Sequence, residues 1–254
     1  ILIDCKTMKL KYFKENNGLH NNTVLSVAFD TFGNLWAGLD SGIDYVCLTS
    51  PFTNLYSYPY SYGAGYTAAV KDGSLYLGTN RGLYYTSYPV QSNGNLPDIR
   101  PVPQSSGQVW NLCHIGDELF CLHDRGIFLI QDNEKTDGEW RVVCKIEGLN
   151  DSSRLFEQED ARTIWMYNTD HITHIKLSEN LTKVTSMKDY DTKDGFPSKN
   201  HIYPAKIKGR IYFATPSGIY KHNIHKDIME PYPDMNNLLN GTATYSRLLE
   251  YNDH

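Results

Sequence analysis

The sequence predicts an all-β protein of the β-propeller type, in which four-stranded sheets are arranged as blades around a central channel. Three observations support this fold class. One pattern of strands and turns repeats five times along the 254 residues. Aromatic side chains make up 13% of the chain, and strands favour such residues. No long segment shows the periodicity of an amphipathic helix.

Each repeat contains a strand, an Asp/Gly turn, an aromatic strand, a polar turn that ends in glycine, and another apolar strand. The second turn gives the period, because its last residues follow one another at intervals of 40, 44, 45 and 47. They are Gly42, Gly82, Gly126, His171 and Gly218. Four short strands in roughly 40–50 residues are typical of a propeller blade. A β-sandwich has no reason to repeat its turn chemistry at a fixed period, and a β-helix has a much shorter one.

Residues 1–254 are predicted to form a single propeller domain or an excised propeller segment. Its five blade cores lie near 24–46, 67–86, 108–130, 155–176 and 202–222. In the second strand of most cores, Leu or Ile precedes an aromatic residue, so the two side chains lie on opposite faces and both faces must be buried. We therefore expect Trp36, Tyr76, Trp165 and Tyr212 to be packing residues.

The two ends of the chain are predicted to be half-blades. Residues 1–4 resemble the third strand of a blade, residues 9–13 an outermost strand, and residues 245–251 the first strand of another blade. The fold is then about five complete blade cores plus a half-blade at each end. It is part of a seven-bladed ring, or a six-bladed ring with a split blade. We favour the former, because residues 252–254 look like the start of a turn. The absence of an initial Met and of a signal-peptide pattern suggests a piece of a longer polypeptide.

Composition excludes several classes of protein. The formal net charge of −5 argues against a nucleic-acid binder. The sequence also contains no run of 18 apolar residues, which is the length that a membrane-spanning helix needs. The five cysteines match no zinc or redox spacing, so we expect free, buried thiols. With a two-residue hairpin loop, Cys113 would face Phe120 and Cys121 would lie on the other sheet face.

Catalytic and metal-binding signals are weak, and we predict no catalytic residue, metal or cofactor. His171 and His174 lie on opposite faces of a strand region. Residues 132–138 lack the acidic twelfth position of a calcium loop and are expected to be a solvated loop. The spacing of Asp30, Gly33, Asn34 and Trp36 is similar to the Asp-box turns of sialidase propellers, in which the box is structural.

The segment 17–43 is more specific than a generic blade. It resembles the regulator-propeller repeat of two-component regulators, whose pattern reads GL-x-x-N-x-V-x-S-I-x-x-D-x-x-G-N-L-W-I-G-T-x-x-G-L. The second copy keeps the Gly-Thr pair at residues 78–79, and the third and fourth lose it. In the fifth, Thr215 remains and residues 194–200 replace the segment DGLPSN. The resemblance covers nearly the whole chain.

The resemblance implies the extracytoplasmic sensor region of hybrid two-component systems or one-component regulators of polysaccharide-degrading gut bacteria. It implies a periplasmic segment of an inner-membrane protein that recognises an oligosaccharide and relays the signal to a kinase or transcriptional output. The implied partners are a neighbouring propeller, an immunoglobulin-like domain of the same chain and a second copy of the receptor. No nucleic acid is expected to contact this segment, and any kinase activity lies outside it. Two alternatives stay open: a lyase or glycosidase acting on polysaccharide, and a scaffold that binds protein.

The turns between second and third strands and the connections between blades are predicted to share one face, which usually carries the ligand. Planar polar groups suit hydrogen bonding to hydroxyls, and aromatic faces suit stacking on sugar rings. The candidate ligand-binding residues are His20, Asn22, Asp40, Tyr62, Tyr66, Asn80, Arg81, Trp110, His123 and Arg125. For each polar one, the alternative is a role in capping a turn or pairing between blades.

Overall fold

The computed structural model describes residues 1–50, 52, 55, 62–90, 97–132, 141–149, 154–168, 170–238 and 247–250. In these residues the predicted all-β fold is confirmed: antiparallel sheets dominate, and the helical elements are short. Two 3-10 turns, η1 (Glu15–Asn17) and η2 (Thr192–Asp194), and one helix, α1 (Pro233–Leu238), occur. No helix in the described part of the chain has the length and apolar character needed to cross a bilayer.

The sheets follow the chain in order, and each strand pairs with the next. A two-stranded sheet, β1 (Leu2–Ile3) and β2 (Leu10–Lys11), precedes five sheets that we call blades 1 to 5. Blade 1 has three strands, β3 (Val24–Phe29), β4 (Leu35–Leu39) and β5 (Ile43–Val46). Blade 2 contains β6 (Gly65–Lys71), β7 (Ser74–Thr79), β8 (Leu83–Ser87) and β9 (Arg100–Pro101). Blade 3 contains β10 (Val109–Ile115), β11 (Glu118–His123), β12 (Gly126–Asp132) and β13 (Arg141–Lys145). Blade 4 contains β14 (Leu155–Gln158), β15 (Thr163–Tyr167), β16 (Ile172–Leu177) and β17 (Val184–Tyr190). Blade 5 contains β18 (Tyr203–Ile207), β19 (Arg210–Thr215), β20 (Gly218–Asn223) and β21 (Ile228–Pro231).

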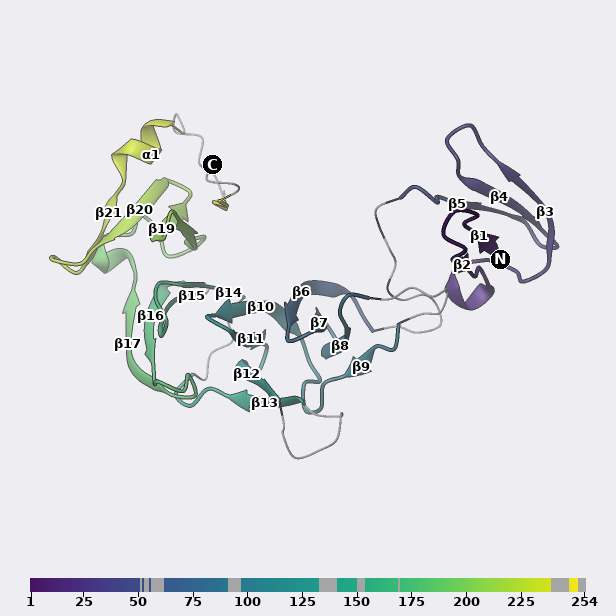
Figure 1. Ribbon diagram of the computed structural model, residues 1–254. Helices are drawn as coiled ribbons and strands as arrows, with labels where there is room; N and C mark the ends of the chain where they lie inside the picture. The colour runs from purple at the N-terminus through teal and green to yellow at the C-terminus, as the bar shows by residue number, and fades with distance from the viewer. Residues whose placement is uncertain are drawn as a thin grey trace.

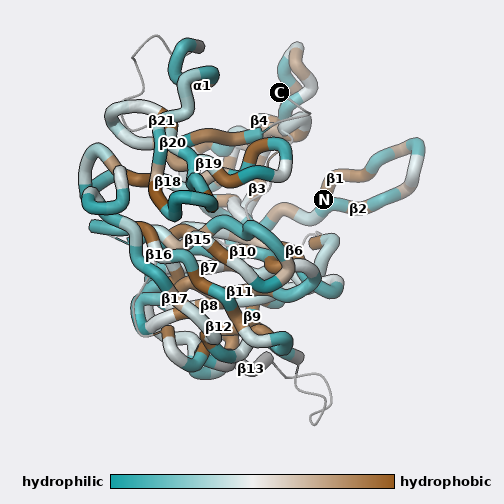
Figure 2. The backbone as a smooth tube through the Cα atoms, turned by 90° about the vertical axis from the view of Figure 1, so that its left-hand side faces the viewer, coloured by the Kyte–Doolittle hydropathy of each residue, from teal (hydrophilic) through white to brown (hydrophobic). Residues whose placement is uncertain are grey.

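Blades 2 to 5 form an open arc (Figure 1). The first strand of each is its inner strand, since β6 contacts β10, β10 contacts β14, and β14 contacts β18. Blade 1 and the β1–β2 sheet lie apart from this arc at one side (Figure 1). The β1–β2 hairpin projects away from the stacked sheets (Figure 2). At the other end, residues 247–250 form no strand, although Leu248 packs against blade 5.

Successive blades of the arc are held together by apolar side chains of their second strands. Tyr76 packs toward blade 3, Phe120 toward blade 4, and Trp165 toward blade 5. The aliphatic residue before each aromatic one lies on the opposite face, as Leu119 does when it joins the cluster with blade 2. Tyr76, Trp165 and Tyr212 are buried, so their expected packing role is confirmed.

Blade 1 does not follow this rule, and the prediction that Trp36 is a packing residue is wrong. Its side chain is 46% exposed, and its ring lies 4.9 Å from that of Tyr45 in the same sheet. Every residue of β3 is exposed. The physical reason is that no blade covers the Trp36 face here, whereas Leu35 and Ala37 on the other face border a hollow beside the β1–β2 hairpin.

The hairpin between β10 and β11 forms as predicted. Its loop has two residues, so Cys113 pairs with Phe120, while Cys121 pairs with Leu112 on the other face. Burial raises the pKa of both thiols to about 12. The expectation of buried thiols fails for two other cysteines, Cys5 and Cys47, which are free but exposed. The side chain of the fifth and the predicted solvated loop beyond residue 132 lie outside the described residues.

Candidate functional site

The turn between second and third strands is closed by one side chain, which explains the Gly-Thr-x-x-Gly pattern. In blade 2, Thr79 Oγ1 accepts hydrogen bonds from the backbone N–H groups of Arg81 (3.0 Å) and Gly82 (3.2 Å). Gly82 has φ +154°, in the region that favours glycine. In blade 5, Thr215 Oγ1 likewise accepts from Ser217 N–H at 3.2 Å. The pattern therefore encodes a turn and needs no ligand.

In blade 3, His123 occupies the position of this threonine and closes the turn in the same way. Its Nδ1 accepts from the backbone N–H of Arg125 at 3.1 Å. Its Nε2 lies 3.3 Å from the carbonyl oxygen of Ser105, in the connection from blade 2. The side chain is buried, and burial lowers the pKa of the imidazole despite the nearby Asp124 carboxylate. We assign His123 to the turn.

Two of the connections, those before blade 1 and before blade 5, begin with a 3-10 turn that is followed by glycine. Gly18 and Gly195 both have positive φ, and they are followed by the buried Leu19 and Phe196. After Gly18, His20 donates its backbone N–H to Asp44 Oδ2 at 2.8 Å, and its Nδ1 lies 2.5 Å from Asp44 Oδ1. The motif inserts an apolar side chain, Leu19 or Phe196, under each of these two connections.

Several of the candidate polar residues are committed to such structural contacts. Asn22 Oδ1 accepts from Glu15 N–H at 2.9 Å, which caps η1. Asn80 Oδ1 accepts from Ala64 N–H at 2.8 Å. The Arg125 guanidinium donates to the backbone carbonyls of Gln104 (2.9 Å) and Ser106 (2.8 Å).

The remaining candidates lie on the same side of the strands. Backbone bonds from Asp40 to Thr23 and from Asn80 to Ala64 join the second-to-third turn to the start of the inner strand. This places turns and blade connections on one face, which we call the turn face. Asp40 and Arg81 are exposed there. The ring of Tyr62 lies 5.1 Å from that of Tyr84 in an edge-to-face contact.

Two of the predicted aromatic residues meet at the inner edge of the arc. Tyr66 and Trp110 each occupy a β-bulge near the start of an inner strand, as Leu25 does in blade 1. A bulge re-aims its side chain relative to the sheet. The Tyr66 and Trp110 rings stack with 5.6 Å between centroids and 8° between planes. Two separately predicted candidates are therefore brought together across blades 2 and 3.

The stack continues through residues that the sequence alone does not single out. Arg154, directly before β14, places its guanidinium carbon 4.5 Å from the Trp110 ring centre. Tyr167 lies 5.2 Å from Tyr203, and the Arg247 guanidinium lies 5.7 Å from the Tyr203 ring.

Burial raises the pKa of the Tyr167 phenol, and the neighbouring Tyr203 raises it further. The positive charges of Arg154 and Arg247 oppose this rise. Both arginines therefore lie within electrostatic range of one phenol. We call this series the aromatic–arginine strip. Its members are Tyr66, Trp110, Arg154, Tyr167, Tyr203 and Arg247.

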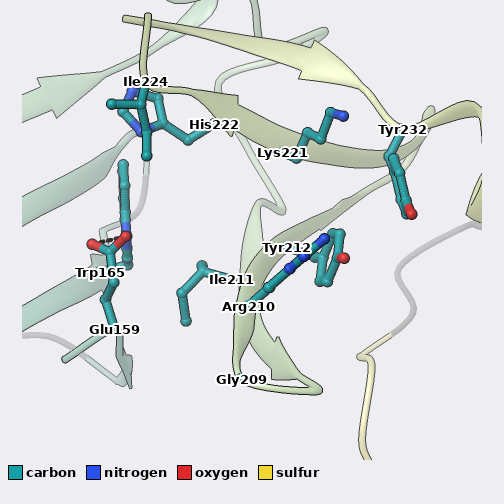
Figure 3. A pocket seen from close by; sticks show the side chains of 10 residues that line it. All are labelled: Glu159, Trp165, Gly209, Arg210, Ile211, Tyr212, Lys221, His222, Ile224 and Tyr232. Atoms are coloured by element: carbon teal, nitrogen blue, oxygen red, sulfur yellow. Dashed lines mark hydrogen bonds between the residues drawn. The ribbon is translucent and has the colours of Figure 1, made fainter.

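A second hollow, of about 370 Å³, lies where two strands of blade 5 separate. Pairing between β19 and β20 ends at Phe213 and Tyr220. Figure 3 shows Trp165 and Glu159 on one side of the opening. The carboxylate is already used within the protein, because Glu159 Oε2 accepts from Trp165 Nε1 at 3.0 Å and lies 2.7 Å from His174 Nε2. These bonds, the one from His174 first, lower the pKa of Glu159.

The described residues show no cluster suited to metal binding. His171 contacts Asp170, whereas His174 contacts Glu159, so the two histidines have separate partners. No group of three His, Cys, Asp or Glu side chains converges in the described ranges. The turn around Asp30 is structural, since Asp30 Oδ1 accepts from two backbone N–H groups at 2.9 Å. The strip, which exposes aromatic and cationic groups, is therefore the candidate ligand site.

Comparison with known proteins supports the fold. No protein-family model matches the chain, and no curated protein matches it either. Two structures of the extracellular domain of BT4673 from B. thetaiotaomicron, described once as a one-component and once as a hybrid two-component system, are similar. Their TM-scores are 0.57 and 0.55 at 16% and 14% identity, over 92% and 87% of this chain. The extracellular domain of the hybrid two-component system BT3049 of the same organism has a TM-score of 0.31 at 15% identity, over 91% of this chain and 43% of that one.

The chain spans about a third of the BT4673 structures, 34% and 32% of their lengths. The predicted resemblance to receptor propellers is thus confirmed at the level of the fold.

Proposed function

We propose that this chain is a ligand-sensing propeller segment in the extracytoplasmic region of a signalling receptor, and that the aromatic–arginine strip binds an oligosaccharide. The observation that carries the proposal is the strip itself. Four blades contribute rings or guanidinium groups to one inner edge, with Tyr66 and Trp110 stacked in parallel. The similar structures are extracellular domains of bacterial one-component or two-component systems, which supports a sensing role.

The composition of the strip suits a sugar chain. Aromatic faces stack on the apolar faces of sugar rings, and guanidinium edges donate hydrogen bonds to oxygen atoms. Because the contributing residues come from successive blades, a ligand that contacts all of them extends over several sugar units. Among the described residues the strip holds no carboxylate, whereas most glycosidases need a pair. Binding without turnover is therefore the function we propose.

Signalling follows if the ligand favours one arrangement of the receptor over another. Blades held by packed apolar clusters resist internal deformation, so we propose a rigid-body change between domains or protomers. The proposed context is periplasmic. A neighbouring propeller and an immunoglobulin-like domain share the chain, the receptor forms a homodimer, and the kinase or transcriptional output lies elsewhere.

The test is titration calorimetry of the 254-residue chain with a panel of oligosaccharides, with chromatography of the same mixtures for products. We expect heat of binding for at least one glycan class and unchanged sugar. Trp110→Ala should weaken that binding at least about 10-fold, as loss of a central aromatic contact does.

The matched control is Trp36→Ala, which removes a half-exposed Trp outside the strip and should leave affinity unchanged. Circular dichroism establishes that each variant is folded. If the Trp110 variant binds as tightly as the unmodified chain, the assignment of the strip is wrong. If the sugar is converted to product, the protein is an enzyme. If no oligosaccharide of the panel gives heat of binding, the proposal of oligosaccharide binding is wrong.

A further inference from the structure

The strip carries two exposed arginine side chains that lie over aromatic rings. The Arg154 guanidinium carbon lies 4.5 Å from the centre of the Trp110 ring, and that of Arg247 lies 5.7 Å from the centre of the Tyr203 ring. A guanidinium that contacts a ring through its face keeps its N–H donors in its own plane. Those donors remain available to a ligand that lies along the strip.

Neither guanidinium is neutralised by the part of the chain that the structure describes. There, no carboxylate lies within ion-pair distance of Arg154 or Arg247, and neither side chain donates a hydrogen bond. Arg125, on the same face, is a useful contrast because its guanidinium donates to two backbone carbonyls. The two strip arginines can therefore donate hydrogen bonds to a ligand, whereas the Arg125 guanidinium already donates to the protein backbone.

Two acidic side chains of the second-to-third turns, Asp124 and Asp170, each lie beside a histidine. Asp124 Oδ1 lies 2.6 Å from His123 Nδ1, and Asp170 Oδ1 lies 2.7 Å from His171 Nδ1. Among the described residues, the inner edge of the arc thus combines aromatic rings with two positive charges that have no carboxylate within ion-pair distance, although the whole chain carries a net charge of −5.

We propose that the ligand is an acidic oligosaccharide, with Arg154 and Arg247 each binding a carboxylate or sulfate group while the exposed parts of the neighbouring rings contact the sugar. This inference rests on the proposed function, namely that the strip binds an oligosaccharide. Arginine matches such oxyanions because two parallel N–H donors meet two oxygen atoms. Arg154 precedes blade 4 and Arg247 follows blade 5, so the ligand bears at least two acidic groups.

The experiment compares hexasaccharides that differ only in charge. One pair is oligogalacturonate and its methyl ester, and the other is a sulfated galactan fragment and its desulfated form. Affinity for the 254-residue chain is measured by calorimetry at low and high NaCl concentration. We expect the acidic member of at least one pair to bind at least about 10-fold more tightly, with a preference that shrinks as salt screens the charges. The pair that shows the preference separates carboxylate from sulfate recognition.

Variants locate the contact. Arg154→Ala and Arg247→Ala should each weaken the affinity for the acidic sugar at least about 10-fold, which is the effect of losing one charge-assisted hydrogen bond. The affinity for the neutral sugar should change little. Arg154→Lys should recover part of the loss, because it keeps the charge without the planar fork. Arg162→Ala is the matched control, an exposed arginine at the opposite end of blade 4.

The outcomes separate the two proposals. Equal binding of acidic and neutral sugars overturns the inference and leaves the proposed function in place. A preference for acidic sugar that both arginine variants retain also overturns it. If none of the four hexasaccharides binds and no oligosaccharide of the wider panel gives heat of binding, the proposed function is overturned.

Discussion

The burial of two tryptophans at equivalent positions gives a sharp prediction about what holds the blades together. Trp165 and Trp36 follow an aliphatic residue in the second strand of their blades, and an acid six residues earlier accepts each indole N–H. The distances are 3.0 Å to Glu159 and 3.4 Å to Asp30. Trp165 is 1% exposed, whereas Trp36 is 46% exposed. The perturbation is alanine at each position in turn.

The magnitudes follow from burial. Removing a fully buried Trp takes away about 150–250 Å² of contact area, and measured Trp→Ala costs in cores are about 3–5 kcal/mol. Trp165 also stacks on His174 at 4.1 Å and meets Phe213 of blade 5 at 5.0 Å. We therefore expect Trp165→Ala to cost about 4 kcal/mol. Trp36→Ala removes roughly half as much buried area, about 100 Å², and leaves no enclosed cavity, so a cost of about 2.5 kcal/mol is expected at about 25 cal/mol per Å².

Urea unfolding followed by far-ultraviolet circular dichroism measures both costs. The loss expected for Trp165→Ala is a large share of a domain's free energy of unfolding, which is about 5–15 kcal/mol. Equal costs would refute the reasoning, because they would mean that another blade covers the Trp36 face in solution. A cost below about 1 kcal/mol for Trp165→Ala would show that the contact between blades 4 and 5 contributes little.

Three further predictions concern a turn, an ion pair and the thiols. Gly195→Ala should cost about 2–4 kcal/mol, because φ is +103° and a Cβ would lie 2.3 Å from a carbonyl oxygen of β21. Gly116→Ala, at φ +58° in open space, should cost only about 1 kcal/mol in the same urea titration. The pKa of Asp227 is held far below its usual value, first by a lysine ammonium and then by a phenol and an imidazole. Asp227→Asn should therefore lower the Tm at pH 7, and the difference from the native chain should shrink as the pH falls below about 4; a constant difference would contradict this linkage. Cys113 and Cys121, with pKa values of about 12, should resist a thiol reagent at pH 8 until the protein unfolds; labelling of either at the rate of a peptide thiol would contradict their burial.

Local chemistry made the fold predictable. A turn such as the one that Thr79 and Gly82 close is complete within four residues, so its pattern is visible in the sequence. The hairpin that places Cys113 opposite Phe120 is equally local. Local chemistry also accounts for the contacts of two candidate residues, because His123 and Asn80 use their polar groups to close a turn and a connection.

The strip was only partly predictable, for the opposite reason. Tyr66 and Trp110 could be proposed because each precedes a blade core, but their stacking depends on two bulges and on how blades 2 and 3 pack. Arg154 and Arg247 give no signal in the sequence, since exposed arginines are common. Their role follows from rings that belong to other strands of the arc.

The sequence by itself determined the strand and turn periodicity, the antiparallel hairpins and the alternation of apolar side chains on the two faces of each blade. These depend on interactions between residues a few positions apart. Only the tertiary structure decided that Trp165 is buried and Trp36 is not, and that aromatic and cationic groups from four blades meet at one edge. Burial and convergence depend on which surfaces face one another after the chain has folded, and identical local patterns can meet different surfaces.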